Sequence, residues 1–286
     1  MMKNIFKVIF LIVAIFSGQK TFAISTTTIT LTPSIVIQGE PVMVTINGAK
    51  LSDIKSTTYD KKALTFFLYK NIPTAFIGVD INKKIGKYEI SVLLNNGEQI
   101  KNILTVNLRP KEEAVMTVPD KLGGNSPSNQ TKVVLQMNKE SQILASLYTG
   151  KKSFWTEKFQ YPLLNPIITD PYGYSRLTGA YTITHKGVDL RATLGTKVMA
   201  ANRGVVRLAK NFQVYGKTIV VDHGLGIMTF YMHLSKIKVN VGELVLPGQV
   251  IGLSGDTGYA ESPHLHLTVR INNASIDPIK FMDFFR

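Results

Sequence analysis

The chain contains five histidines, all between positions 185 and 266, and two motifs there have the spacing of a metal site. His264 and His266 open a run rich in strand-forming residues, and side chains two positions apart on a strand point to the same face. The residues between His185 and Asp189 include Gly187 and a β-branched residue, which indicates a strand end and a turn rather than a helix. Because the chain has no cysteine, a zinc ion would be held by imidazole and carboxylate groups. Two imidazoles and one carboxylate would leave a coordination position open for water, which is typical of catalytic zinc sites.

The alternative for His264 and His266 is a structural pair in the core, which would need hydrogen-bond partners for both rings. His233 lies in a second strand-like run, on the face opposite an apolar face that belongs to the core. A lone histidine on a strand is usually a surface or capping residue, whereas a hydrolytic zinc site without a nearby glutamate base would need one more histidine. His223 stands at a turn between two strands, and we expect a hydrogen-bonding role for it.

The elements that position these residues are predicted to be almost entirely strands. Residues 154–286 form short strand-like runs separated by glycines, and no helix is expected among them. Residues 24–110 alternate apolar and polar positions between turn signals, which predicts a small antiparallel sandwich without clustered chemistry. Residues 111–131 are rich in Pro, Gly, Ser and Asn and predict a flexible linker, and residues 132–148 have apolar positions at helical spacing. The predicted fold class is therefore all-β and mainly antiparallel, with an N-terminal β-sandwich, a C-terminal β-sheet domain and one connecting helix.

The first 23 residues have the pattern of a secretory signal peptide. Lys3 and Lys7 precede an apolar run that is too short to cross a bilayer comfortably, and Thr21-Phe22-Ala23 is a small-x-small cleavage pattern. An uncleaved N-terminal anchor is the alternative. No later segment reaches the length of a membrane span, so the mature protein is expected to be exported without a transmembrane span. The expected division of the chain is 1–23, 24–110, 111–150 and 151–286.

The net charge of the chain indicates which kinds of partner it can attract. Lys and Arg exceed Asp and Glu by 33 to 19, which gives +14 and suits an anionic partner such as nucleic acid, acidic lipid or a cell-wall polymer. The excess is spread along the mature chain without a Lys/Arg run. A specific nucleic-acid surface is therefore not expected.

Residues 162–278 resemble the lysostaphin-type (LytM-domain) zinc metalloendopeptidases, which cleave peptide cross-links of bacterial peptidoglycan. The resemblance passes, in order, through Tyr172–Arg176, His185–Asp189, Gly195–Val198, Gly204–Val206, Val221–Gly226, Tyr231–Ser235, Gly242–Gly252 and Ser262–His266. It implies one zinc ion held by His185, Asp189 and His266. It also implies that His233 and His264 orient and deprotonate the attacking water and stabilise the oxyanion.

The resemblance implies a metalloendopeptidase that acts on peptidoglycan in the periplasm or in the extracellular cell wall. The chain departs from the family where Glu261-Ser262 precede, and Leu267-Thr268 follow, the Pro-His-Leu-His segment, which bears on substrate preference and loop shape. A non-catalytic wall-binding protein, or an activator of other wall hydrolases, is the alternative. Residues 242–252 also look like the hairpin of a biotinyl or lipoyl carrier domain, but the turn Leu246-Pro-Gly248 lacks the lysine that such domains modify.

Overall fold

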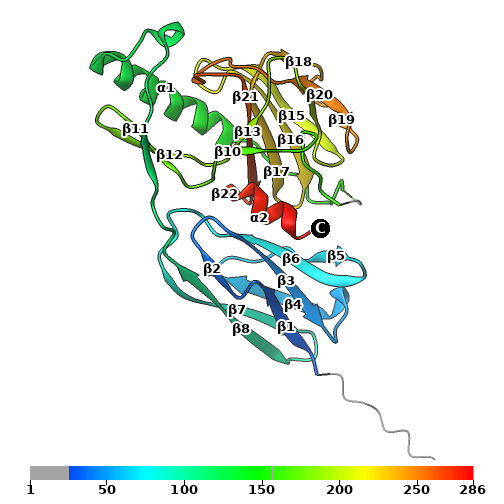
Figure 1. The fold of residues 1–286 in the computed structure, drawn as a ribbon. Helices are drawn as coiled ribbons and strands as arrows, with labels where there is room; N and C mark the ends of the chain where they lie inside the picture. Colours follow the sequence, from blue (N-terminus) through cyan, green and yellow to red (C-terminus); the bar gives the residue numbers. More distant parts are fainter. Residues whose placement is uncertain (1–25, 156–157, 286) are drawn as a thin grey trace, which may run out of the picture.

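The computed structural model describes residues 26–155 and 158–285 and divides them into two β-rich domains (Figure 1). The predicted signal peptide, residues 1–23, lies outside the described residues. Within the described part of the chain, neither helix combines the length and the apolar character needed to cross a membrane.

The N-terminal domain is a sandwich of two four-stranded sheets, with strand orders β1-β3-β6-β5 and β2-β8-β7-β4. The strands alternate as the sequence predicts: β1, for example, buries Ile29 and Leu31 between exposed threonines. Most pairs are antiparallel, and β2 pairs with β8 in parallel. The bounds are β1 (Thr28–Thr32), β2 (Ile35–Ile37), β3 (Pro41–Asn47), a 3-10 turn (Leu51–Asp53), β4 (Ile54–Tyr59), β5 (Phe67–Tyr69), β6 (Ile72–Gly78), β7 (Gly86–Leu94) and β8 (Gln99–Asn107).

The segment expected to be a flexible linker is instead packed against the C-terminal domain. It forms β9 (Glu113–Val115), which lies parallel to β11, and a 3-10 turn (Asp120–Leu122). The helix α1 (Pro127–Ala145) begins five residues before the predicted start, because Ser126 caps it and Pro127 occupies its first turn. The polar residues that suggested a loop are thus the cap and first turn of the helix.

The C-terminal domain is built on an eight-stranded sheet in which β10-β13-β21-β17-β16-β15-β19 are neighbours and β22 pairs with β21. A smaller sheet, β14-β20-β18, and the hairpin β11–β12 with β9 flank it. The bounds are β10 (Ile168–Asp170), β11 (Ser175–Thr178), β12 (Tyr181–Thr184), β13 (Val188–Arg191), β14 (Lys197–Met199), β15 (Gly204–Asn211), β16 (Lys217–Gly224), β17 (Ile227–Leu234), β18 (Lys236–Ile237), β19 (Leu244–Val245), β20 (Val250–Leu253), β21 (His264–Ile271) and β22 (Ala274–Ile276).

The expectation of no helix in this domain was wrong. A six-residue helix, α2 (Pro278–Asp283), follows the last strand. The Asp277 side chain accepts from the backbone N–H groups of Ile279 and Lys280 and so caps its start. A helix of this length is too short to produce a periodic pattern in the sequence, and only its Asp-Pro start could have indicated it.

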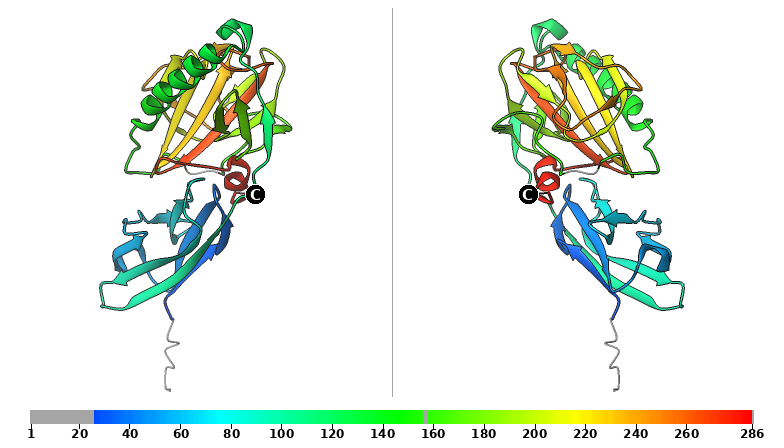
Figure 2. Two further views of the ribbon diagram at one scale, coloured as in Figure 1. Left: turned by 90° about the vertical axis from the view of Figure 1, so that its left-hand side faces the viewer. Right: turned by 90° about the vertical axis from the view of Figure 1, so that its right-hand side faces the viewer.

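Helix α1 lies across one face of the large sheet, as Figure 2 shows from the side. Leu144 near the end of α1 joins a buried cluster with Phe230 and Met232 of β17. At the opposite end of the C-terminal domain, Phe76 of β6 enters a cluster that includes Trp155 and Phe281. The two domains therefore share one hydrophobic cluster.

Candidate metal centre

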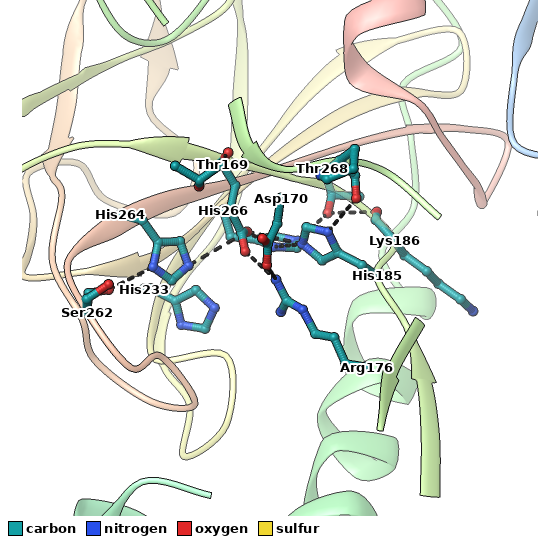
Figure 3. Close-up of polar contacts among 12 residues, drawn as sticks. Thr169, Asp170, Arg176, His185, Lys186, His233, Ser262, His264, His266 and Thr268 are labelled. Carbon is teal, nitrogen blue, oxygen red and sulfur yellow. Dashed lines mark hydrogen bonds and ion pairs between the residues drawn. The ribbon is translucent and has the colours of Figure 1, made fainter. Parts of the chain in front are cut away.

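The predicted site residues come together on three adjacent strands and at the end of a fourth (Figure 3). Asp189 on β13 stands directly opposite His266 on β21, and His185 follows the end of β12. His264 lies two residues before His266 on the same strand, and His233 lies on β17, the strand on the other side of β21. Residues up to 81 positions apart in the sequence thus meet at adjacent strands inside the large sheet.

The side chains of His185, Asp189 and His266 converge on one point. Nε2 of His185 lies 3.1 Å from Oδ1 of Asp189 and 2.9 Å from Nδ1 of His266. Nδ1 of His266 lies 2.8 Å from the same carboxylate oxygen. All three residues are buried, and their potential ligand atoms lie within 4.8 Å of one another.

The hydrogen bonds on the far side of each ring decide which nitrogen carries the proton. Nδ1 of His185 faces the backbone oxygen of Pro171 at 2.9 Å, and a carbonyl can only accept, so this nitrogen is the donor. Nε2 of His266 lies 2.9 Å from the hydroxyl of Thr268, which gives its own proton to the backbone oxygen of Lys186. The hydroxyl must therefore accept from His266. Nε2 of His185 and Nδ1 of His266, the two nitrogens that face Asp189, therefore carry lone pairs and no proton. Because the carboxylate oxygen also only accepts, no hydrogen bond can form among these three atoms, whereas a divalent cation can bind all of them.

The second oxygen of Asp189 is held by an ion pair with Arg176 of β11, which also bonds to Asp170 at 2.7 Å. Burial of Asp189 acts to raise the pKa of its carboxyl, but that pKa lies well below its ordinary value, and the paired Arg176 guanidinium favours the charged form. The carboxylate is therefore ionised, as a metal ligand must be.

His233 and His264 lie beside this centre with one ring nitrogen free. Nδ1 of His233 donates to the backbone oxygen of Thr257, and Nδ1 of His264 donates to that of Ser262, each at 2.8 Å. The two rings lie 5.0 Å apart between centroids. Nε2 of His264 is buried without a hydrogen-bond partner among the described residues, and it lies 3.7 Å from the nearer oxygen of Asp189.

The environment of His233 keeps its ring neutral. Burial lowers the pKa of His233 well below its ordinary value, and the neighbouring His264 and His266 lower it further. A neutral imidazole with a free Nε2 can accept a proton. The φ angle of His233 is 60°, in the left-handed region, so the surrounding structure must hold this residue in place.

Helix α1 supplies part of that support through Glu140. The buried carboxylate of Glu140 accepts hydrogen bonds of 2.9–3.1 Å from the backbone N–H groups of Gln213, Val214 and Tyr215. The backbone oxygen of Tyr215 accepts in turn from the N–H of His233 at 3.2 Å. The supporting residues Glu140, Arg176 and Thr268 are not predicted from the sequence. Only Thr268 had a signal, because it lies two positions after His266 on the same strand face.

His223 is not part of this centre. Its Nδ1 faces the backbone oxygen of Arg203, and its Nε2 faces the hydroxyl of Thr229, both at 2.8 Å. Burial lowers the pKa of His223 to about 4. The residue therefore has the hydrogen-bonding role that we expect from the sequence.

Two cavities adjoin the candidate metal centre. The larger, of about 550 Å³, lies between α1, the β11–β12 hairpin and the sheet, and His185, His233 and His266 line it. The smaller, of about 330 Å³, reaches Asp189 and His264 from the side of β10. An elongated ligand can therefore approach the centre from both sides.

The family of the C-terminal domain follows from a match between its sequence and a family model. Residues 183–278 match the model described as peptidase family M23. This part of the chain is an M23 peptidase domain of the LytM/lysostaphin type. All five site residues predicted from the sequence lie within the matched range.

The comparison with known proteins supports the same family and fold. The M23 domain is similar to the peptidoglycan DD-endopeptidase ShyA of Vibrio cholerae, with 41% identity over 96 residues. It is also similar to the DD-carboxypeptidase/endopeptidase Mpg of Neisseria meningitidis, with 36% identity over 119 residues. These matches cover 34% and 41% of this chain but only 22% and 27% of the relatives, so the chain spans about a quarter of their length.

One solved structure resembles nearly the whole chain. It is a Pseudomonas aeruginosa protein assigned to peptidase M23, with a TM-score of 0.63, 23% identity, and coverage of 86% of this chain and 94% of that chain. The similarity extends beyond residues 183–278, so the fold of most of the chain recurs in another protein.

Proposed function

We propose that this protein is an exported zinc metalloendopeptidase that hydrolyses peptide cross-links of bacterial peptidoglycan. The observation that carries the proposal is the convergence of three lone-pair atoms, from His185, Asp189 and His266, beside two histidines whose Nε2 atoms are free. The M23 domain and the activities named for the relatives ShyA and Mpg support the reaction class and the substrate. The signal pattern of residues 1–23 and the net charge of +14 support action in the periplasm or the cell wall.

In this mechanism His185, Asp189 and His266 hold one zinc ion, and Arg176 and Thr268 keep two of these ligands oriented. When bound, zinc polarises the scissile carbonyl and lowers the pKa of water to about 7. The free Nε2 atoms of His233 and His264 accept the proton of the attacking water and return a proton to the leaving amine. The backbone oxygens of Thr257 and Ser262 fix both tautomers for this role.

The non-catalytic alternative, a wall-binding protein or hydrolase activator, is not favoured by the site. A protein that only binds the wall has no need for four histidines with fixed tautomers around one buried carboxylate. Both functions predict binding to peptidoglycan, and they differ in whether covalent bonds are broken.

The deciding experiment incubates the zinc-loaded chain lacking residues 1–23 with purified sacculi and identifies the released muropeptides by mass spectrometry. Hydrolysis of cross-links would reduce the dimers and increase the monomers, and a chelator would stop this change until zinc is restored. Binding to sacculi with an unchanged dimer fraction would instead support the non-catalytic alternative.

A further inference from the structure

Arg270 lies on the same strand face as the candidate metal centre. Side chains at alternate positions of β21 share a face, so His264, His266, Thr268 and Arg270 point the same way. The guanidinium of Arg270 lies over the ring of Phe230, 4.5 Å from its centroid. Because Phe230 pairs with Thr268, the Arg270 side chain leans along the strand toward the histidines.

The charge of Arg270 is not neutralised by a neighbouring group. Its Nη1 donates to the backbone oxygen of Leu144 at 3.1 Å, and its Nε donates to the hydroxyl of Ser275 at 3.3 Å. Across residues 26–155 and 158–285, no carboxylate forms an ion pair with Arg270, and Nη2 has no hydrogen-bond partner. Burial lowers the pKa of Arg270, which reflects the cost of a desolvated cation without an anion.

The larger cavity connects Arg270 with the metal centre, since both Arg270 and the histidines His185 and His266 line it. Lys186, whose side chain is exposed, adds a second cation. Arg176 also lines the cavity but is already paired with two aspartates. Asp80 is the carboxylate that faces the cavity, and it raises the pKa of Arg270 through space without pairing with it. The cavity therefore keeps an excess of positive charge next to the candidate site.

We propose that Arg270 binds a free carboxylate of the peptide substrate and so fixes the position of the peptide relative to the metal centre. This inference rests on the proposed function, because it assumes that the cavity takes a peptide. The guanidinium of Arg270 lies over Phe230, which pairs with Thr268. Measured along the strand, it is therefore about two residues, or about 7 Å, from His266. An extended peptide covers about the same length with two residues. The recognised carboxylate thus lies about two residues from the scissile bond.

The test compares peptides that differ only in this charge. Muropeptide dimers from sacculi are used with their carboxyl groups free and after conversion to carboxamides. Their dissociation constants are measured by calorimetry with the zinc-loaded protein carrying His233→Ala, in which turnover is suppressed. The same measurement is made after adding Arg270→Gln, Arg270→Lys or Arg203→Gln. Arg203 is the matched control, because it is an exposed arginine outside both cavities.

The free-carboxylate dimer is expected to bind about tenfold more tightly than its carboxamide to the protein with Arg270 and to the Arg203→Gln control. Arg270→Gln removes this preference, and Arg270→Lys retains part of it. The inference is overturned if Arg270→Gln keeps the preference, or if both Arg270 variants weaken the two dimers equally, since that is the result of a purely structural role. Digestion of sacculi by the wild-type protein reports separately on the proposed function.

Discussion

Each histidine of the candidate centre donates one N–H to a fixed acceptor and presents the other nitrogen to the site. Three of these acceptors are backbone oxygens, those of Pro171, Thr257 and Ser262, and the fourth is the Thr268 hydroxyl. A backbone acceptor cannot change its role when a side chain is replaced. The tautomers are therefore built into the fold, and the residues can be tested one at a time.

The first prediction separates chemistry from metal binding at His233. His233→Ala should retain about one zinc per chain, because the three proposed ligands remain, but should lose a factor of about 10²–10⁴ in hydrolysis rate. Zinc content by mass spectrometry and muropeptide release are measured on the same preparation. Loss of zinc together with activity would show that His233 is a ligand and that its assigned role is wrong.

The second prediction concerns pH and His223. Its pKa in the folded protein is about 4, below the ordinary value of 6.5. Between these two pH values the histidine is protonated in the unfolded chain and neutral in the folded protein. Protonation of His223 in the unfolded chain does not affect the unfolding free energy above about pH 6.5, and it lowers that free energy progressively as the pH falls toward 4. Between pH 7 and pH 5 the cost is about 2 kcal/mol.

His223→Gln removes this titration whatever its effect on absolute stability. The variant should therefore lose about 2 kcal/mol less unfolding free energy than the wild type between pH 7 and pH 5, as measured by urea denaturation. The neighbouring Asp222 and the backbone oxygen of Arg203 are unchanged in the variant. Equal losses in the two proteins would contradict the assignment of a buried neutral His223.

Among the elements, α1 is part of the peptidase domain rather than a connection to it. It covers the sheet face formed by Phe230 and Met232, and Glu140 fastens it to the loop that precedes β16. That loop contacts the backbone of His233 through Tyr215. A change in the helix should therefore reach the candidate site.

The third prediction is that Glu140→Gln lowers the unfolding free energy by about 1–3 kcal/mol, because an amide cannot accept all the backbone N–H groups that the carboxylate accepts. The rate of hydrolysis should fall as well, since the loop beside His233 loses its support. Glu113→Gln, at an exposed position of β9, is the matched control and should change neither quantity. If Glu140→Gln leaves both the unfolding free energy and the hydrolysis rate unchanged, Glu140 does not support the loop beside His233.

The strands were predictable because alternation marks them directly, as in Ile29 and Leu31 of β1. The start of α1 was not, because Ser126 and Pro127 are residues that serve equally in loops and in caps. The histidine motifs indicated which side chains meet, since spacing on a strand determines the face. The supporting groups could not be inferred, because the acceptors Pro171 and Thr257 come from loops 14 and 24 residues away from the histidines that they hold.

At the scale of the whole molecule, the two domains are joined by packing as well as by the chain. Phe76 of the N-terminal domain is 5% exposed and stacks on Phe284 with ring centroids 6.0 Å apart. Arg109, just after β8, forms an ion pair of 3.8 Å with Asp277, the cap of α2. We expect regulation or positioning of the peptidase domain by residues 24–110, and this interface is where such an effect would act.

The fourth prediction is that the two domains unfold in one calorimetric transition and that Phe76→Ala lowers the unfolding free energy by about 3–5 kcal/mol. The cost arises because the variant leaves a cavity in the cluster that the domains share. Leu68→Ala, at a position that is 56% exposed, is the control and should stay within about 0.5 kcal/mol of the wild type. Two separate transitions in the wild type would show that the shared cluster does not couple the domains.

We propose that His185, Asp189 and His266 hold one zinc ion on which hydrolysis depends. The most direct test of this proposal is the rate of cross-link cleavage as zinc is titrated into the metal-free protein, for the wild type and for Asp189→Asn. The wild-type rate is expected to rise from near zero to a plateau at about one zinc per chain, and the rate of the variant is expected not to rise. Full activity of the metal-free wild type, or an equal rise in Asp189→Asn, would contradict it.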